Sequence, residues 1–188
     1  HANQTGTARP TYQASGINGM PAFYFDGASD QHFDVSSTAW WLSEINAGAF
    51  SLFFVSSIDL TDPAINTSIF VNAQSGVGGV PRHYFNNNTI SYNTLNTISN
   101  PSQATTKKGL TVVQHDGVQT LTHINYDGVE TTATIAAVNP SPGYYVFPGA
   151  VENDIKSGVF SEHLLYKGSL TSGDRSTVIA YFKQKYSL

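Results

Sequence analysis

The stretch GLTVVQHDGVQTLTHINYDGVETTATIAAV, residues 109–138, gives the clearest indication of the fold class. Two Asp-Gly pairs, at 116–117 and 127–128, separate three runs of strand-like sequence. Glycine accepts the positive φ of a tight turn, so this pattern predicts three antiparallel strands joined by two hairpins. The third strand has one apolar face, which we expect to point inward: Val129, Ala133, Ile135 and Ala137.

Further strands are predicted on both sides of this stretch. The run AFSLFFVSSIDL, residues 49–60, is apolar on both alternating faces, which is typical of a central strand covered on both sides. Its two faces carry Phe50, Leu52, Phe54 and Ile58 on one side, and Phe53 and Val55 on the other. PAFYFDG at 21–27, TSIFVNA at 67–73 and RHYFNNNTISY at 82–92 are also strand-like. Short strands without alternating helices predict an all-β, antiparallel two-sheet sandwich.

The last thirty residues predict a strand from Val159 to Tyr166 followed by a single helix. Thr171 or Ser172 can cap the helix, and Asp174 lies in its first turn, where the helix dipole favours an acid. Its apolar stripe and its C-terminal cations are Val178, Ile179 and Phe182, and Lys183 and Lys185. We expect a helix of about 12 residues that begins near Thr171 and packs on a sheet.

The composition excludes several classes of protein. The length of 188 residues suits one domain over 1–188. The net charge of −4 provides no basic surface for nucleic acid or an anionic membrane. Without cysteine there is no disulfide framework and no thiolate metal site. No apolar run approaches the ~18 residues of a membrane span, so we expect no membrane insertion.

Three segments resemble the LamG-like type of concanavalin A-like lectin/glucanase domains. They are RPTYQASGINGMPAFYFDGASDQHF near the start, VVQHDGVQTLTHINYDGVE in the middle and GVFSEHLLYKGSLTSGDRSTVIAYFKQKY at the end. The resemblance implies a jelly-roll sandwich that ends in a short packed helix. The opening HANQTG resembles the tail of a strand that such domains carry earlier, so we expect the chain to be part of a longer polypeptide.

The resemblance leaves the function open, because such domains serve as sugar-binding and adhesion modules, as hydrolases and lyases, and in phage structural proteins. A glycosidase needs two carboxylates ~5–9 Å apart. No closely spaced pair is present, because the glutamates are isolated: Glu44, Glu130, Glu152 and Glu162. Glu162 and its neighbour His163 are predicted to face opposite sides of a strand.

Other catalytic chemistries lack a motif as well. A lyase base is conceivable at His83 and Tyr84 beside Arg82, or at His115 with His123 across a hairpin, but no lyase motif surrounds either set. There is no Gly-x-Ser-x-Gly elbow for a serine nucleophile. We therefore predict that the chain is not an enzyme.

One acidic segment is a weak calcium candidate. DGASDQHFD places Asp26, Asp30 and Asp34 at intervals of four, and calcium takes carboxylate and carbonyl oxygens from such loops. The competing interpretation is that Asp26 and Gly27 form a turn after a strand. No other cofactor is predicted.

Aromatic and amide side chains provide the best candidates for a binding site. Sugars stack on aromatic rings and hydrogen-bond to amides, hydroxyls and charged groups. The candidate ligand-binding residues are Trp40, Trp41, Arg82, His83, Tyr84, Asn86 and Tyr92. The competing interpretation is that these aromatics fill the core and the Asn residues form turns.

These observations favour a carbohydrate-binding or adhesion module of a virion, such as a phage particle, or of an extracellular surface protein. Its expected partners are a glycan or cell-surface polysaccharide and other virion or surface proteins. The alternatives are a structural or decorating particle domain without a ligand and, more remotely, a polysaccharide-degrading jelly-roll enzyme. We expect the protein on a virion surface or outside the cell.

Overall fold

The structure is a computed structural model that describes residues 2–3, 9–26, 31, 33–35, 49–59, 67–73, 82–86, 89–92, 96–99, 106–124, 128–134, 144–147 and 157–188. Its strands form two sheets, each with seven described strands. The order in the sheet that carries the helix is β12 (Glu130–Thr134), β11 (Thr120–Ile124), β10 (Thr106–Asp116), β5 (Ala49–Asp59), β14 (Gly158–Lys167), β3 (Met20–Phe25) and β2 (Thr11–Ile17). The order in the second sheet is β1 (Ala2–Asn3), β4 (Phe33–Val35), β13 (Tyr144–Phe147), β6 (Thr67–Ala73), β7 (Arg82–Asn86), β8 (Thr89–Tyr92) and β9 (Asn96–Ser99).

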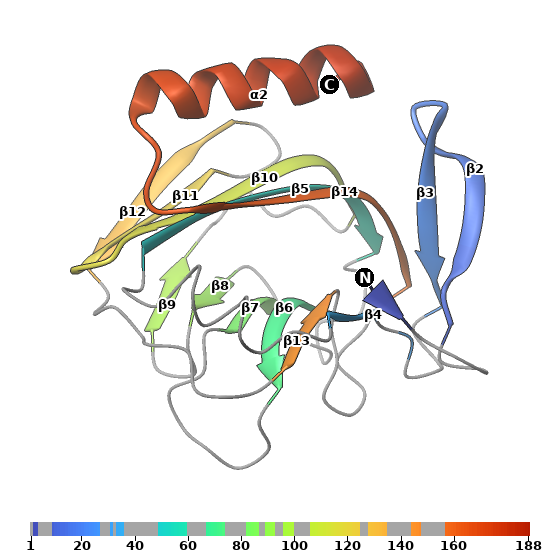
Figure 1. Cartoon of the computed structure of the whole chain (residues 1–188), viewed down its shortest axis with the longest axis horizontal. Coiled ribbons are helices and arrows are strands. Elements are labelled where there is room, and N and C mark those ends of the chain that lie inside the picture. The colour runs from blue at the N-terminus through green and yellow to red at the C-terminus, as the bar shows by residue number, and fades with distance from the viewer. Residues whose placement is uncertain are drawn as a thin grey trace.

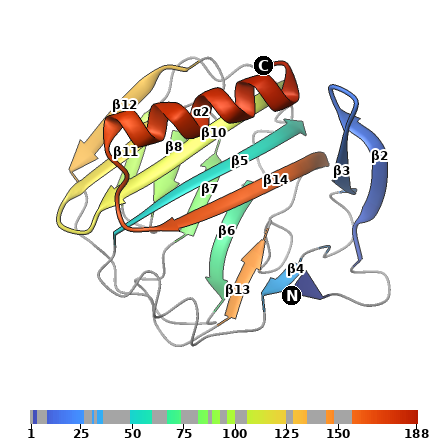
Figure 2. The same ribbon diagram turned by 45° about the horizontal axis from the view of Figure 1, so that its top comes forward.

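The molecule has three layers. Helix α2 (Ser172–Tyr186) lies across the outer face of the first sheet, and the second sheet lies on the opposite side of that sheet (Figures 1 and 2). Described strand pairs such as β10 with β5 and β14 with β3 run antiparallel. The predicted all-β, two-sheet antiparallel sandwich with one C-terminal helix is therefore confirmed.

Strand β5 is the centre of the first sheet. It pairs with β10 from Ala49 to Asp59 and with β14 on its other side. Both of its faces are buried, because Phe50, Leu52, Phe53, Phe54 and Val55 are each at most 1% exposed. The predicted central strand, covered on both sides, is thus confirmed, and the side chain of Ile58 lies outside the described residues.

The hairpins β10–β11 and β11–β12 occur where the Asp-Gly pairs predict them. Gly117 and Gly128 have φ values of 85° and 82°. At the first turn, the Asp116 carboxylate accepts hydrogen bonds from the backbone N–H groups of residues 118, 119 and 120. These bonds, that of Thr120 foremost, hold the pKa of Asp116 well below its usual range.

One detail of the third strand was predicted wrongly. Val129 is 49% exposed rather than inward. It directly follows the Gly128 turn and precedes the first residue of β12, which is the outermost strand of the sheet, so no further described strand flanks it. Ala133 is half-buried as expected, and Ile135 and Ala137 lie outside the described residues.

Helix α2 begins as predicted and ends later than predicted. The Thr171 side chain caps it by accepting from the Asp174 N–H, and Lys183 and Lys185 lie in its last turn. The helix has 15 residues, rather than about 12, because Tyr186 also packs on the sheet and is only 3% exposed. The helix–sheet core contains Ile17, Ala22, Phe53, Val55, Leu110, Val112, Ile124, Phe182 and Tyr186, with Val178 and Ile179 packed against it.

Aromatic rings connect the two sheets. Phe33 of β4 contacts Phe23 and Phe25 of β3, with ring centroids 4.9 Å and 5.9 Å apart. Phe25 in turn contacts Phe160 of β14 at 5.4 Å. Among the described residues, α2 is too short and too polar to cross a bilayer, and no other helix qualifies.

Candidate functional site

A buried polar network fixes the start of helix α2 against the sheet. The Ser51 hydroxyl lies 3.0 Å from both Gln114 Oε1 and the Gly168 carbonyl oxygen, and it accepts the Leu170 N–H at 3.0 Å. Gln114 Nε2 donates to Ser169 Oγ and to the Leu170 carbonyl oxygen. Ser51 is fully buried and Gln114 is 6% exposed, so these bonds form away from water. The segment between β14 and α2 therefore has a defined path.

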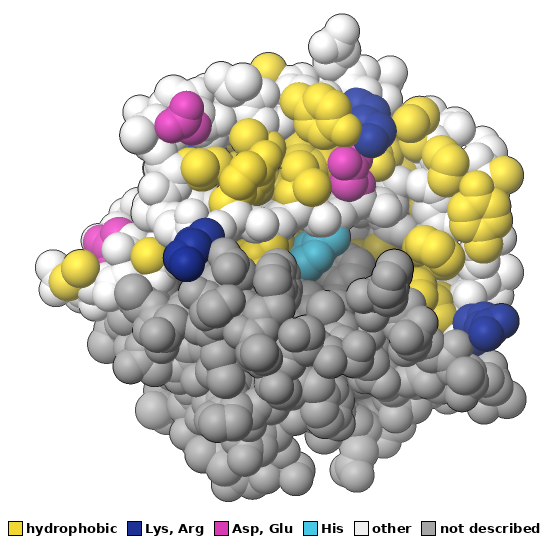
Figure 3. All heavy atoms as spheres, viewed as in Figure 1, with side chains coloured by type: hydrophobic (Ala, Val, Ile, Leu, Met, Phe, Trp, Pro, Cys, Tyr) yellow, Lys and Arg dark blue, Asp and Glu magenta, His cyan; other side chains and the backbone are white. Residues whose placement is uncertain are grey.

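A second polar cluster holds the other end of the helix. The Glu162 carboxylate of β14 accepts from Lys185 Nζ at 2.7 Å, from the Tyr186 hydroxyl at 3.1 Å and from the Tyr181 hydroxyl at 3.2 Å. The hydrogen bond to Glu162 raises the pKa of Lys185, and burial raises the pKa of Tyr186. Asn18 Nδ2 adds a bond to the Tyr186 carbonyl oxygen at 2.7 Å. In Figure 3, hydrophobic side chains gather over the helix and the sheet beside it, with acidic and basic side chains at their margin.

The side chains of Glu162 and His163 lie on opposite sides of β14, as predicted. Glu162 bonds to the helix, whereas His163 pairs in register with Phe54, whose side chain is fully buried. Burial lowers the pKa of His163 to about 3. The Glu162 carboxylate is bonded to Lys185 and to two tyrosines on the helix side of the strand. Glu162 and His163 therefore do not form an acid–base dyad.

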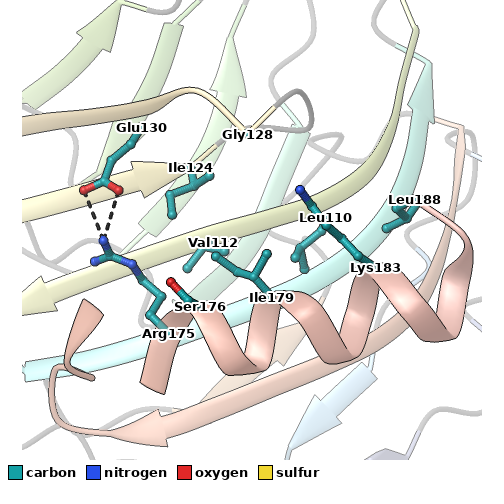
Figure 4. A pocket seen from close by; sticks show the side chains of 10 residues that line it. All are labelled: Leu110, Val112, Ile124, Gly128, Glu130, Arg175, Ser176, Ile179, Lys183 and Leu188. Carbon is teal, nitrogen blue, oxygen red and sulfur yellow. Dashed lines mark hydrogen bonds and ion pairs between the residues drawn. The ribbon is translucent and has the colours of Figure 1, made fainter. Parts of the chain in front are cut away.

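With both ends anchored, the helix leaves a groove along one side. The groove has a volume of about 490 Å³ and lies between α2 and strands β10, β11 and β12 (Figure 4). Its floor is aliphatic, with Leu110 and Val112 from β10, Ile124 from β11 and Ile179 from the helix. The other described residues of the lining are Gly128, Glu130, Arg175, Ser176, Lys183 and Leu188.

Charged side chains stand at both ends of the groove. At one end Arg175 of the helix reaches both carboxylate oxygens of Glu130, at 3.2 Å and 3.0 Å. At the other end Lys183 extends from the helix across the groove toward the strands (Figure 4). The Lys183 side chain is exposed and makes no hydrogen bond or ion pair with any residue that the structure describes.

Among the described residues, this arrangement offers groups that a ligand could contact and lacks the carboxylate pair of glycoside hydrolysis. Glu130 is the one carboxylate side chain among the described residues that line the groove, and hydrolysis needs two. An apolar floor between polar ends instead suits a ligand with an apolar face and polar termini.

The predicted binding residues fall in the second sheet or outside the described residues. Trp40 and Trp41 lie outside them. Residues 82–86 form β7 and 89–92 form β8, and their backbones pair so that His83 lies opposite Tyr92 and Asn86 opposite Thr89. Arg82 and Tyr84 belong to the same strand, β7, so the backbone brings five of the seven residues into one hairpin. Their side chains lie outside the described residues.

Two of the three calcium candidates, Asp26 and Asp34, lie in different segments of the structure. Asp26 follows β3, where its backbone N–H donates to Gln31 Oε1 at 2.7 Å, and Asp34 belongs to β4. Asp30 lies outside the described residues. Within the part of the chain that the structure describes, no group of three acidic, His or Cys residues could hold a metal ion.

His115, one half of a conceivable lyase pair, is a core residue. It is fully buried, its ring is stacked on Phe50 with centroids 6.4 Å apart, and its Nδ1 accepts the Gly117 N–H. The backbone places it opposite Leu121, and His123 opposite Val113.

The sequence interpretation missed the groove because its residues come from four elements. It assigned Lys183 to the helix dipole and treated Glu130 as isolated. The signal that could have found part of it is the spacing of Arg175, Ile179 and Lys183, at i, i+4 and i+8 on one helix face. That stripe sets cations on either side of an apolar residue.

Comparisons with known proteins show the fold. No family model and no curated protein matches the chain. Among solved structures, the receptor-binding domain of botulinum neurotoxin C/D mosaic serotype matches with a TM-score of 0.68 and 13% identity, over 96% of this chain and 46% of that one. The binding domain of Paraclostridial Mosquitocidal Protein 1 matches with a TM-score of 0.64 and 9% identity, over 98% of this chain and 51% of that one.

A third match is the binding domain of botulinum neurotoxin DC in complex with rat synaptotagmin II, with a TM-score of 0.62 and 9% identity, over 93% of this chain and 46% of that one. The chain thus spans about half the length of these solved structures. All three are described as binding domains, and at 9–13% identity they show a likeness of fold alone. The LamG-like relationship stays a prediction.

Proposed function

We propose that the chain is a binding module of the concanavalin A-like type that recognises carbohydrate on a cell surface. The observation that carries this proposal is the shared fold, which extends over 96% and 98% of the chain in two solved binding domains. The role in adhesion, and the location outside the cell or on a virion such as a phage particle, belong to the same proposal. They are supported by the low fraction of charged residues, 12%, with polarity supplied by uncharged side chains.

The proposed recognition surface on the second sheet is the β7–β8 hairpin with Trp40 or Trp41. The hairpin carries Arg82, His83, Tyr84, Asn86 and Tyr92, which are residue types that offer the ring faces and hydrogen-bonding groups that sugars require. Its support is that the backbone register gathers five of these residues into one hairpin.

The experiment is a glycan array probed with the purified 188-residue chain, followed by cell binding in the presence of the best glycan. We expect selective binding to one class of glycan and competition on cells by that free glycan. If no glycan is bound, the proposal is wrong; if cells are not bound either, the decorating domain without a ligand replaces it.

A further inference from the structure

The groove beside helix α2 differs from the proposed surface on the second sheet in both place and chemistry. It lies on the helix-bearing sheet and its floor is aliphatic rather than aromatic (Figure 4). We infer that this groove is a subsite for a short acidic saccharide, such as a disaccharide, that carries a single carboxylate or sulfate group. The inference rests on the proposed carbohydrate binding and identifies a class of sugar for it.

The first argument is the state of the three charged side chains. Arg175 forms an ion pair with Glu130, and it contacts the two carboxylate oxygens of Glu130 at 3.2 Å and 3.0 Å. Lys183 has no ion-pair partner among the described residues. Among the lining side chains that the structure describes, Lys183 is therefore the one cation without a carboxylate partner, and it complements one negative charge on the ligand and sets where that charge lies.

The second argument is the length of the groove. Arg175 and Lys183 are eight residues apart on the helix, which corresponds to about 12 Å at ~1.5 Å per residue. A ligand that spans this distance meets Lys183 with its anion and Glu130 with its opposite end. Glu130 is 46% exposed, and its carboxylate can accept hydrogen bonds from sugar hydroxyls in addition to those from Arg175.

The third argument is the floor between these ends. Ile179 is half-buried and Ile124 is 8% exposed, so both offer some aliphatic surface against which the C–H face of a pyranose ring can pack, whereas Val112 is fully buried. A fatty acid would also place a carboxylate on Lys183. Its apolar tail would then run against the Arg175–Glu130 pair and remove water from two charges without new hydrogen bonds, which is unfavourable.

The test measures affinity for three matched disaccharides by calorimetric titration: one with a glucuronic acid unit, one neutral, and one with a single sulfate. We expect at least one acidic disaccharide to bind about tenfold more tightly than the neutral one, because a hydrogen-bonded ion pair forms at Lys183. Lys183→Gln should remove that preference, and Lys183→Arg should keep it. Lys167→Gln, an exposed lysine on β14 away from the groove, is the matched control.

The outcomes separate this inference from the proposed function. If the Lys183→Gln protein keeps the parent's preference for acidic sugars, the groove assignment is wrong. If the parent binds only neutral glycans on the array, the groove assignment is wrong but the proposed function stands. The groove assignment is also wrong if octanoate binds in the groove and the acidic disaccharides do not. If the parent binds no glycan, both fail together. Thermal unfolding of each variant confirms that lost binding is not lost folding.

Discussion

The ring of Phe182 in helix α2 lies stacked over the ring of Phe53 in the central strand β5, with centroids 6.2 Å apart and planes 12° from parallel. Both side chains are fully buried. This contact joins the last element of the chain to the centre of the first sheet. It also gives the helix its structural role: the helix covers the outer face of that sheet.

Phe182→Ala should lower the free energy of unfolding by about 3–5 kcal/mol, because it removes a buried ring and leaves a cavity under the helix. Urea denaturation followed by circular dichroism measures the change. Gln184→Ala, at an exposed position of the same helix, is the control and should change stability by less than about 0.5 kcal/mol. Equal effects of the two substitutions would show that the helix does not pack as described.

Ser51→Ala should lower the free energy of unfolding by about 1–3 kcal/mol, although it removes a single oxygen atom. The Leu170 N–H would lose its acceptor and Gln114 would lose a partner, both away from water. The measurement is again the free energy of unfolding. Ser176→Ala, on the exposed helix surface, removes the same oxygen and should be nearly neutral. A neutral Ser51→Ala would mean that water replaces the lost bonds.

The free energy of unfolding should fall as the pH is lowered below about 6.5. Burial lowers the pKa of His163 from 6.5 to about 3, so the unfolded chain binds a proton in this window that the folded chain does not. The stability due to the neutral imidazole is therefore present above pH 6.5 and lost as the pH falls toward 3, at no more than about 1.4 kcal/mol per pH unit.

The slope between pH 6.5 and 5.5 is the informative quantity, because carboxylates, whose ordinary pKa values are about 4, remain largely ionised there. We expect His163→Gln to flatten the slope relative to the parent protein, whatever its effect on stability at pH 7. Chemical denaturation at four or five pH values supplies both curves. Parallel curves for parent and variant would show that His163 takes up its proton in the folded state.

The parts of the fold that the sequence predicted are those with local signals. Thr171 and Asp174 define the start of the helix by capping and charge, and the Asp-Gly pairs define two hairpins by backbone conformation. The wrong assignments concern residues at the ends of elements. Val129 follows a turn at the sheet edge, and Tyr186 extends the helix because a non-local contact buries its ring.

The groove could not be predicted in the same way because it depends on the order of strands in the sheet. Placement of β14 between β5 and β3 pairs residues 158–167 with residues that lie at least about a hundred positions earlier. Only then does the helix that follows β14 come to lie along β10, β11 and β12. Alternation and spacing indicate which face of each strand is apolar, but they do not indicate which strands become neighbours.

The last prediction concerns the proposed recognition surface. Alanine at Tyr84, Tyr92, Trp40 or Trp41 should weaken glycan or cell binding if the ring stacks on a sugar, by about 0.5–1.5 kcal/mol beyond the loss of contact area. The melting temperature should hardly change, because a ring that stacks on a ligand is not part of the core. Tyr12→Ala, which removes a ring that is 59% exposed at the edge strand β2 of the other sheet, is the matched control.

These four variants and the control are compared in the glycan array and by thermal unfolding. At least one of the four should bind more weakly at an unchanged melting temperature, while the Tyr12 variant binds as the parent does. If all four bind as the parent does, the β7–β8 hairpin is not the recognition surface. If every variant that loses binding also unfolds at a lower temperature, the rings belong to the core, and the binding surface must be sought on the helix-bearing sheet.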